Sequence, residues 1–314
     1  MAVPVIASDF FRRIGPSLRR IRPSLPRVTL RAKRPNAVLP SGPAEPPIRP
    51  VDPPLWERSV AARLGRYSIR LATCTEDRIA ACRLRFEVFN LELGEGLSTS
   101  YSTGIDEDEF DLVCDHLIVE DEIEGRIVGT YRMQSGLSAA TNLGYYSQQE
   151  FDFAPYENIR HQVLELGRAS IDRQHRSSEV LTLLWRGIAQ YAKLFGLRYL
   201  IGCSSLASQD PLEGWRLYQK LSSSFLASAQ YLTRPTEQFA LHIHLNCDLS
   251  SCEEGDETPG PVHCPKVLKT YLAIGARICG PPAWDREFGT IDFLTLLDLE
   301  QLSSAARSRF LTER

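Results

Sequence analysis

Apolar residues from about position 67 onwards recur with two different periods, and these periods alternate along the chain. Where apolar and polar residues alternate, or a short apolar run is bounded by turn residues, we predict strands. They cover 67–73, 116–121, 126–134, 163–172, 199–206, 239–247 and 291–299. Apolar residues at helical spacing predict helices over 79–93, 177–196, 210–221 and 267–275. This order predicts an α/β fold, a mixed central sheet flanked by helices.

The first 54 residues lack this periodicity and differ in composition. Residues 10–34 contain nine Lys or Arg and no Asp or Glu, and residues 35–54 contain eight prolines. The lack of a periodic apolar pattern and the many prolines predict a disordered, basic, Pro-rich leader over 1–54. The folded domain is then expected over 55–314.

Basic and apolar side chains are mixed within residues 10–34, where Phe10, Phe11 and Ile14 lie among the arginines. This mixture suits an anionic membrane surface, which attracts the cations and admits the aromatic rings. Nucleic-acid binding, an organellar transit peptide and a solvated tail are the alternatives. We predict contact with a membrane surface and no nucleic-acid partner, because aromatic residues for base stacking are absent beyond the two phenylalanines.

The composition of the whole chain is that of an ordinary globular protein, with 43% hydrophobic and 24% charged residues. Eight scattered cysteines are typical of buried thiols in a reducing compartment, and no apolar run reaches 18 residues. We therefore expect a cytoplasmic protein, peripheral on the cytoplasmic membrane face where it meets lipid. The spacing of six neighbouring residues fits no standard zinc template, so we predict no metal site at His242, His244, Cys247, Cys252, His263 and Cys264.

The strongest chemical signal is the predicted strand VLELGRASID (163–172), which carries the carboxylate of Glu165 among apolar residues. Transfer of an acyl group from a thioester to an amine needs a base that takes the proton of the amine. Glu165, with Arg168 three positions later, suits that role. The alternative is an ordinary ion pair at a strand end.

This strand leads through RQHRSS (173–178) into a predicted helix. A helix start offers free backbone N–H groups, and Arg173 and Arg176 add positive charge beside the hydroxyls of Ser177 and Ser178. Such a group suits the phosphate of a thioester carrier. The alternative is a capped helix with no ligand.

Five motifs occur in order: RFEVF (85–89), DEDEFD (106–111), GTYR (129–132), LELGRASI (164–171) and YLAIGARICGPPAWDREFGTIDF (271–293). Together they resemble the GNAT-related N-acyltransferases, also called hemolysin-like, that use acyl carrier protein and make lyso-ornithine or related aminolipids. More distantly, they resemble the acyl-homoserine lactone synthases. The resemblance runs from about residue 67 to residue 299 and implies a GNAT-like fold and an enzyme.

The resemblance also implies roles for single residues. Glu165 and Arg168 match the family's E-L-x-R strand and are implied as catalytic residues. Residues of the other motifs are implied to bind the amino-acid substrate: Arg85, Phe89, Asp108, Asp111 and Arg132. The phosphopantetheine arm of the carrier is expected to contact Arg173, Arg176, Ser177 and Ser178.

Two departures refine this expectation. The segment Arg173-Gln-His-Arg-Ser-Ser lacks the glycines that close around a coenzyme A pyrophosphate, so it fits the single phosphate of phosphopantetheine better. Glu95 stands where the homoserine lactone synthases carry an aromatic residue.

The resemblance therefore implies transfer of a fatty acyl group from acyl carrier protein to the α-amine of an amino acid. A 3-hydroxyacyl group is the first candidate for the group transferred. Ornithine is the first expected acceptor, and acyl carrier protein is a co-substrate with no cofactor bound. The alternatives are a synthase of the acyl-homoserine lactone type, and a catalytically inert membrane- or nucleic-acid-binding protein on the same fold.

Overall fold

The computed structural model describes residues 60–241, 263–302 and 307–308. The predicted leader over 1–54, with its basic segment 10–34, lies outside these residues and stays a prediction. The same holds for most of the predicted strand 239–247 and for four of the six His and Cys residues weighed as zinc ligands: His242, His244, Cys247 and Cys252.

A single mixed sheet forms the centre of the described chain, with strand order β1-β2-β3-β4-β5-β6-β9-β7 and with β8 also paired to β9. Neighbouring strands are antiparallel, except that β5 and β6 are parallel. The strands are Ala62–Leu64 (β1), Tyr67–Leu71 (β2), Asp115–Asp121 (β3), Arg126–Ser135 (β4), Val163–Ile171 (β5), Tyr199–Leu206 (β6), Arg277–Ile278 (β7), Ala283–Asp285 (β8) and Thr290–Asp298 (β9).

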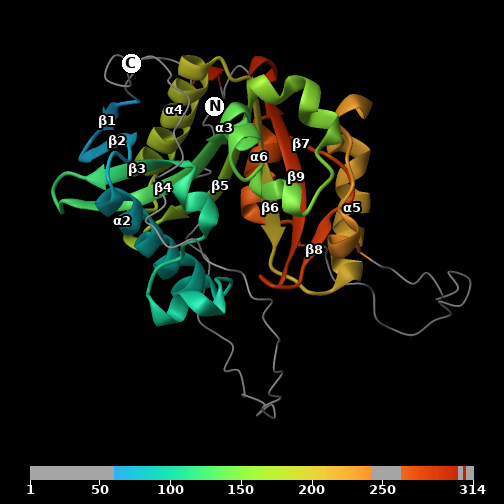
Figure 1. The fold of residues 1–314 in the computed structure, drawn as a ribbon, viewed down its shortest axis with the longest axis horizontal. Helices are drawn as coiled ribbons and strands as arrows, with labels where there is room; N and C mark the ends of the chain where they lie inside the picture. The colour runs from blue at the N-terminus through green and yellow to red at the C-terminus, as the bar shows by residue number, and fades with distance from the viewer. Residues whose placement is uncertain (1–59, 242–262, 303–306, 309–314) are drawn as a thin grey trace, which may run out of the picture.

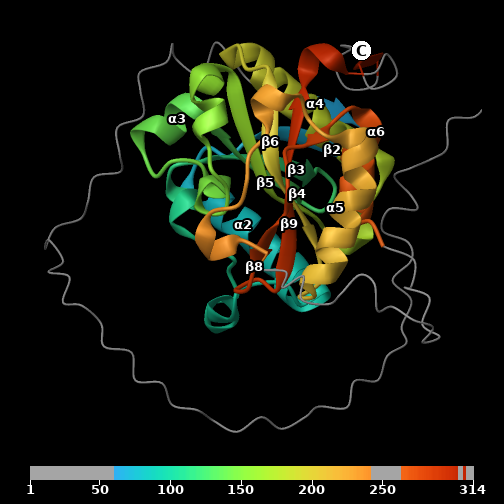
Figure 2. The same ribbon diagram turned by 90° about the vertical axis from the view of Figure 1, so that its right-hand side faces the viewer.

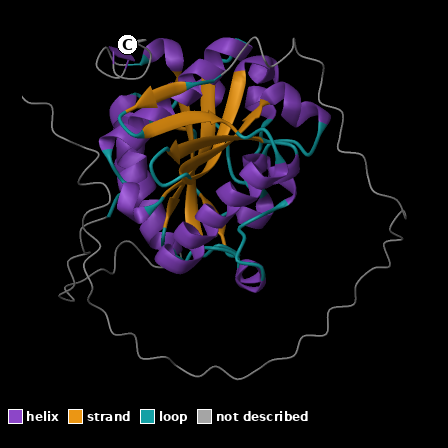
Figure 3. Ribbon diagram, turned by 90° about the vertical axis from the view of Figure 1, so that its left-hand side faces the viewer, coloured by secondary structure: helices purple, strands orange, loops and turns teal. Residues whose placement is uncertain are grey.

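Helices cover both faces of the sheet (Figures 1 and 2). One face carries three of them: Ser178–Phe195 (α4), Pro211–Phe225 (α5) and Lys266–Ile274 (α6). The other face carries Thr75–Phe86 (α2), which continues as a π-helical turn over Glu87–Leu93, and Gly136–Thr141 (α3). Short 3₁₀ turns lie in the connections between these helices and strands. Figure 3 distinguishes helices, strands and loops by colour. None of the helices in the described ranges combines the length and hydropathy that crossing a membrane requires.

Most of the predicted elements are confirmed, because their signals are local. The side-chain oxygen of Ser177 accepts a hydrogen bond from the Val180 N–H at 3.3 Å, so α4 begins at the predicted cap. It ends at Gly196, whose φ of 64° is the left-handed geometry that favours glycine. The predicted strand from residue 239 is not seen in its described part, where Phe239 closes a 3₁₀ turn. The sequence pattern also missed β1, β7 and β8, which are too short to show a period.

The sheet opens between β5 and β6. Across the described residues, the two strands pair at three positions only, from Val163 opposite Tyr199 to Glu165 opposite Ile201, although both continue beyond them. At the last point of contact, Gly202 approaches the backbone of β5 so closely that a Cβ there would lie 2.3 Å from the Leu166 carbonyl oxygen. Beyond this point the facing backbone edges of the two strands are no longer joined.

A second irregularity lies on the other side of β5, at Arg168. Between the pairs Thr130–Ser170 and Arg132–Gly167, β5 has one residue more than β4, which is a β-bulge. Arg168 occupies it with φ of 52°, a left-handed conformation that costs a non-glycine residue about 1–2 kcal/mol. Strain of this kind collects at functional sites, where it aims a side chain.

The opening of the sheet predicts a stability difference between two glycines of the same region. Gly202→Ala is expected to lower the free energy of unfolding by about 1–3 kcal/mol, because its methyl group meets rigid backbone. Gly167→Ala is the matched control, since no atom lies within 4 Å of the added Cβ and its φ is not left-handed. Urea unfolding of the two variants checks this, and equal stabilities would contradict the close contact between β5 and β6.

Candidate active site

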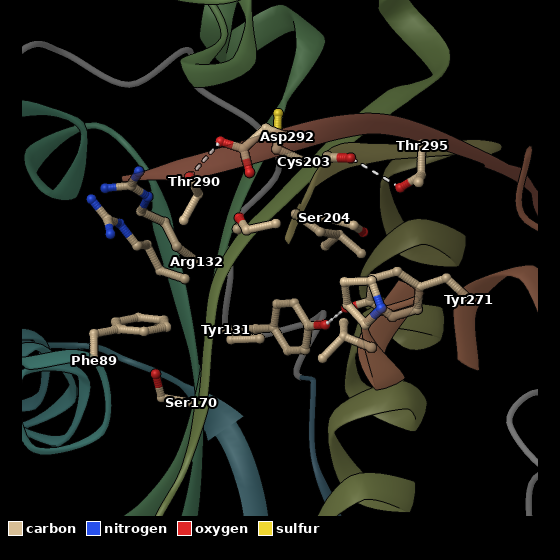
Figure 4. A pocket seen from close by; sticks show the side chains of 18 of the residues that line it. Phe89, Tyr131, Arg132, Ser170, Cys203, Ser204, Tyr271, Thr290, Asp292 and Thr295 are labelled. Atoms are coloured by element: carbon tan, nitrogen blue, oxygen red, sulfur yellow. Dashed lines mark hydrogen bonds between the residues drawn. The ribbon is translucent and has the colours of Figure 1, made fainter. Parts of the chain in front are cut away.

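A cavity of about 680 Å³ occupies the opening between β5 and β6. Its apolar part lies toward α4 and α6 and is lined by Leu166, Leu184, Trp185 and Leu297, among others. Beside it, the hydroxyl groups of Tyr131 and Tyr271 are joined by a hydrogen bond (Figure 4). The polar part of the cavity lies on the opposite face of the sheet. The cavity can thus hold a long apolar chain with a polar head.

Side chains from four neighbouring strands reach this polar part because of the strand register. Gln134 of β4 lies opposite Glu165 of β5, and Arg132 lies two positions before Gln134 on the same face. Counting by two along β6 and β9 places Cys203 and Asp292 on that face as well. All five line the cavity, and Figure 4 shows Arg132, Cys203 and Asp292 around its upper left part.

Glu165 is 5% exposed and is held at its last pairing position on β5. Its two carboxylate oxygens accept hydrogen bonds from the backbone N–H groups of Tyr146 and Ser147, each at 2.8 Å. Burial raises the pKa of Glu165 above its ordinary value, although these N–H groups pull it the other way. A buried carboxylate with a raised pKa is a suitable proton acceptor near neutral pH.

Arg85, which α2 places beneath the polar part, does not line the cavity. It is 1% exposed, and it donates hydrogen bonds to Asp106, including one from Nε at 2.8 Å, and to Asp111 at 2.5 and 3.1 Å. Burial alone would raise the pKa of Asp111, but the charges of Arg85 and Arg132 outweigh burial and hold it below its usual range. These residues form a buried ion-pair network, hereafter the arginine–aspartate network.

Arg132 and Arg168 join the arginine–aspartate network at the cavity wall. Arg132 donates to Asp108 at 2.5 Å and to Asp111 at 3.2 Å. Arg168 lies 3.7 Å from Asp106 and 3.6 Å from Asp108, and its guanidinium stacks 5.8 Å from the Phe89 ring. The network thus matches three arginines to three aspartates and presents two of its guanidinium groups to the cavity.

The predicted phosphate site is arranged differently from its sequence pattern. Arg173 is exposed, and the Ser177 hydroxyl caps α4 beside the exposed Ser178. Arg176 donates to both carboxylate oxygens of Glu92, and it also donates to the Ile171 carbonyl at 3.1 Å. Arg176 therefore fastens the π-helical turn after α2 to the end of β5. Of the predicted group, Arg176 lines the cavity, whereas Arg173, Ser177 and Ser178 do not.

Sequence reasoning missed several polar residues of the cavity. Glu150, Asp285 and Asp292 are buried together, and Gln134 and Cys203 lie nearby on the same face of the sheet. Gln134 and Asp292 carried a usable signal, because Gln134 lies two positions after Arg132 on the same face of β4 and Asp292 lies between the apolar Ile291 and Phe293 of β9. Glu150 and Asp285 carried none, since they lie in a turn and at the end of a very short strand.

Comparison with known proteins matches this chain to a family. Residues 84–186 match the family model described as an acetyltransferase (GNAT) domain. The L-ornithine N(alpha)-acyltransferase of Brucella abortus (strain 2308) is 32% identical over 256 residues, which cover 78% of this chain and 89% of that protein. The chain belongs to the L-ornithine N(alpha)-acyltransferase family. The protein of that name from Rhodobacter capsulatus is 31% identical over 81% of this chain and 98% of its own length. The predicted GNAT-like fold and the acyltransferase class are confirmed.

Solved structures of low sequence identity also match this chain. The AHL synthase LasI is 12% identical over 79% of this chain and 98% of its own, with a TM-score of 0.45. FeeM, an N-acyl amino acid synthase from uncultured soil microbes, is 12% identical over 78% of this chain and 95% of its own, with a TM-score of 0.43.

The arginine–aspartate network predicts a large and pH-dependent stability effect. Arg85→Met leaves Asp106 and Asp111 buried without their main partner and is expected to cost about 3–5 kcal/mol. Below about pH 4 the loss should shrink, because acid protonates Asp111 first in the unfolded chain and in the folded variant, where Arg85 no longer holds its pKa down. Chemical unfolding at pH 7 and pH 3.5 measures both effects.

Arg63→Met is the control, because Arg63 pairs with Glu122 at the surface and its side chain is 76% exposed. That change is expected to cost less than about 1 kcal/mol. Similar losses for the two variants would show that the arginine–aspartate network does not hold the site together.

Proposed function

We propose that this chain transfers a fatty acyl group from a carrier thioester to the α-amine of L-ornithine. A 3-hydroxyacyl group is the first candidate for the group transferred. The main support for this proposal is the position of Glu165. Its buried carboxylate is fixed by two backbone N–H groups at the point where β5 and β6 separate. It stands in a cavity that has both an apolar and a polar part. Membership of the L-ornithine N(alpha)-acyltransferase family supports the acceptor.

The reaction needs one proton acceptor and donors for an oxyanion. The neutral amine attacks the thioester carbonyl carbon and gives up a proton to Glu165, directly or through a water molecule. The carbonyl oxygen becomes an oxyanion, for which backbone N–H groups on the separated edges of β5 and β6 are candidate donors. When the tetrahedral intermediate collapses, the carbon–sulfur bond breaks, and the thiolate leaves and is protonated. The products are an amide and a free thiol.

The opening between the strands suits a carrier arm. A phosphopantetheine arm contains amide groups, and the facing edges of β5 and β6 offer backbone groups that no strand satisfies within the described chain. Its phosphate would lie near Arg173 and the start of α4, where Arg173 is exposed. The acyl chain would extend along Leu184 and Trp185. The carrier in this proposal is acyl carrier protein, as the family resemblance implies.

The acceptor's carboxylate would be recognised by arginine. Arg132 and Arg168 line the cavity, and a guanidinium binds a carboxylate through two parallel hydrogen bonds. Phe89 stacks on Arg168 and limits its freedom. Arg85, Asp108 and Asp111 then act from behind, by fixing the position of these guanidinium groups.

The proposal predicts the product and its dependence on Glu165. Acyl carrier protein loaded with a 3-hydroxy fatty acid, L-ornithine and the full-length chain should give the Nα-acylated amino acid, identified by mass spectrometry. Glu165→Gln keeps the shape of the side chain but cannot take the proton, so kcat should fall by about 10²- to 10⁴-fold. Activity of the wild type should decrease as the pH falls through the raised pKa of Glu165, because protonation removes the base.

Glu157→Gln is the control for this experiment, since Glu157 lies at the surface and pairs with Arg160. It should retain wild-type turnover. If Glu165→Gln melts like the wild type and turns over at a near-normal rate, Glu165 is not the base. If no amino acid is acylated from any thioester, the proposed function is wrong.

We also propose that residues 10–34 attach the protein to the cytoplasmic face of an anionic membrane, where an acylated product would remain. Replacing Arg12, Arg13, Arg19 and Arg20 with Gln in the full chain removes four cations. At about 1 kcal/mol each, this should weaken binding to vesicles with anionic lipid by about 10³-fold at low salt. Vesicle sedimentation measures it. Undiminished binding would exclude the segment as an anchor.

A further inference from the structure

A group of three carboxylates in the polar part of the cavity has no assigned role. Glu150, Asp285 and Asp292 are each at least nine-tenths buried, and one oxygen of each lies within 4.8 Å of the others. All three line the cavity that Glu165 also lines. They come from a turn, from β8 and from β9, so the fold brings them together from distant positions.

Among the described residues, these three carboxylates lack a positive partner. Within residues 60–241 and 263–302, no lysine, arginine or histidine forms an ion pair with any of them. The arginine–aspartate network, by contrast, matches each aspartate to an arginine. Burial and mutual repulsion raise the pKa of Glu150 well above its ordinary range, and burial raises that of Asp292 to about 6. A buried acidic group of this kind is completed by a cation.

A separate observation indicates a ligand in the same cavity. Gln134 is 2% exposed and lines the cavity beside Glu165, yet neither its carbonyl oxygen nor its amide nitrogen has a hydrogen-bond partner among the described residues. Leaving such a group unsatisfied costs about 1–3 kcal/mol. Oδ1 of Asp292 is unsatisfied as well, while Oδ2 accepts from Thr290 at 3.1 Å (Figure 4). A polar ligand that extends through the cavity from Gln134 to Asp292 would satisfy both.

The cluster of three carboxylates is connected to Glu165 through short contacts. The N–H of Ser147 donates to Glu165, and the Cys203 thiol lies 3.4 Å from the Ser147 hydroxyl and 3.8 Å from the Glu150 carboxylate. A small molecule with two amines on a short aliphatic chain can therefore place one amine at Glu165 and the other among the three carboxylates.

We infer that Glu150, Asp285 and Asp292 bind the side-chain ammonium of a diamino-acid acceptor and so select it over amino acids with an apolar side chain. This inference rests on the proposed function and assigns its acceptor specificity. An ammonium group has three N–H donors, which three carboxylates can accept. A divalent cation is the competing occupant, because Mg²⁺ is bound by one or two carboxylates together with water molecules, and the experiment below distinguishes it from an ammonium group.

The test compares L-ornithine with L-norvaline, which has the same carbon chain and no second amine. Full-length wild-type protein should acylate ornithine with a kcat/KM at least about 100-fold above that for norvaline. Asp292→Asn and Glu150→Gln should each reduce this preference at least about tenfold, mainly by raising the KM for ornithine. Glu157→Gln, at the surface, should keep the wild-type preference. Calorimetric titration without the acyl donor should show the same order of affinities.

Folding and metal binding are separated from specificity in the same experiment. Asp292→Asn should melt at or above the wild-type temperature, because it removes like-charge repulsion; a large loss shifts the test to Glu150→Gln. An unchanged ornithine preference in folded variants would overturn the inference. So would a preference abolished by a chelator and restored by Mg²⁺ or Mn²⁺, since the carboxylates would then hold a metal ion. Equal acylation of both amino acids by the wild type refutes the inference alone, whereas no acylation of either refutes the proposed function with it.

Discussion

The parallel pairing of β5 and β6 ends after three residue pairs, and the chemistry of the site depends on that ending. A fully paired sheet would satisfy its own backbone groups and leave no room between the strands. Here Gly202 permits one last close contact, after which the two strands separate around a cavity of about 680 Å³. Glu165 stands at the point of separation, so the proposed base, the separated backbone edges and the apolar part of the cavity meet in one place.

Charge is balanced on one side of this cavity and unbalanced on the other. Three arginines and three aspartates form the arginine–aspartate network. Arg168 adopts a strained left-handed backbone conformation at the bulge in β5, and its guanidinium group lies within this network. The charges on this side balance without a ligand, and Arg132 and Arg168 line the cavity. Across the cavity, Glu150, Asp285 and Asp292 have no cation of their own within the described chain. An acceptor with a carboxylate at one end and an ammonium at the other matches both sides.

Much of this was predictable from the sequence, because the signals are local. Period and caps placed β5, α4 and β6, and a single carboxylate on an apolar strand identified Glu165. The bulge at Arg168 was not predictable, since it depends on the register between β4 and β5. Pairing partners were equally hidden: Arg176 fits a phosphate site by its position, but the fold directs it to Glu92. The grouping of Glu150 and Asp285 with Asp292 was not predictable either, because it depends on contacts between residues distant in sequence.

The proposed binding of the thioester arm between β5 and β6 is tested most directly by hydrogen exchange. The amides of residues 166–169 and 202–205 should exchange more slowly when a non-hydrolysable acyl-phosphopantetheine analogue is bound, because the arm would satisfy backbone groups that the strands leave free. Amides at 117–119 on β3, which are paired on both sides, serve as the reference and should not change. Tight binding of the analogue without protection at β5 and β6 would contradict the placement of the arm between these strands.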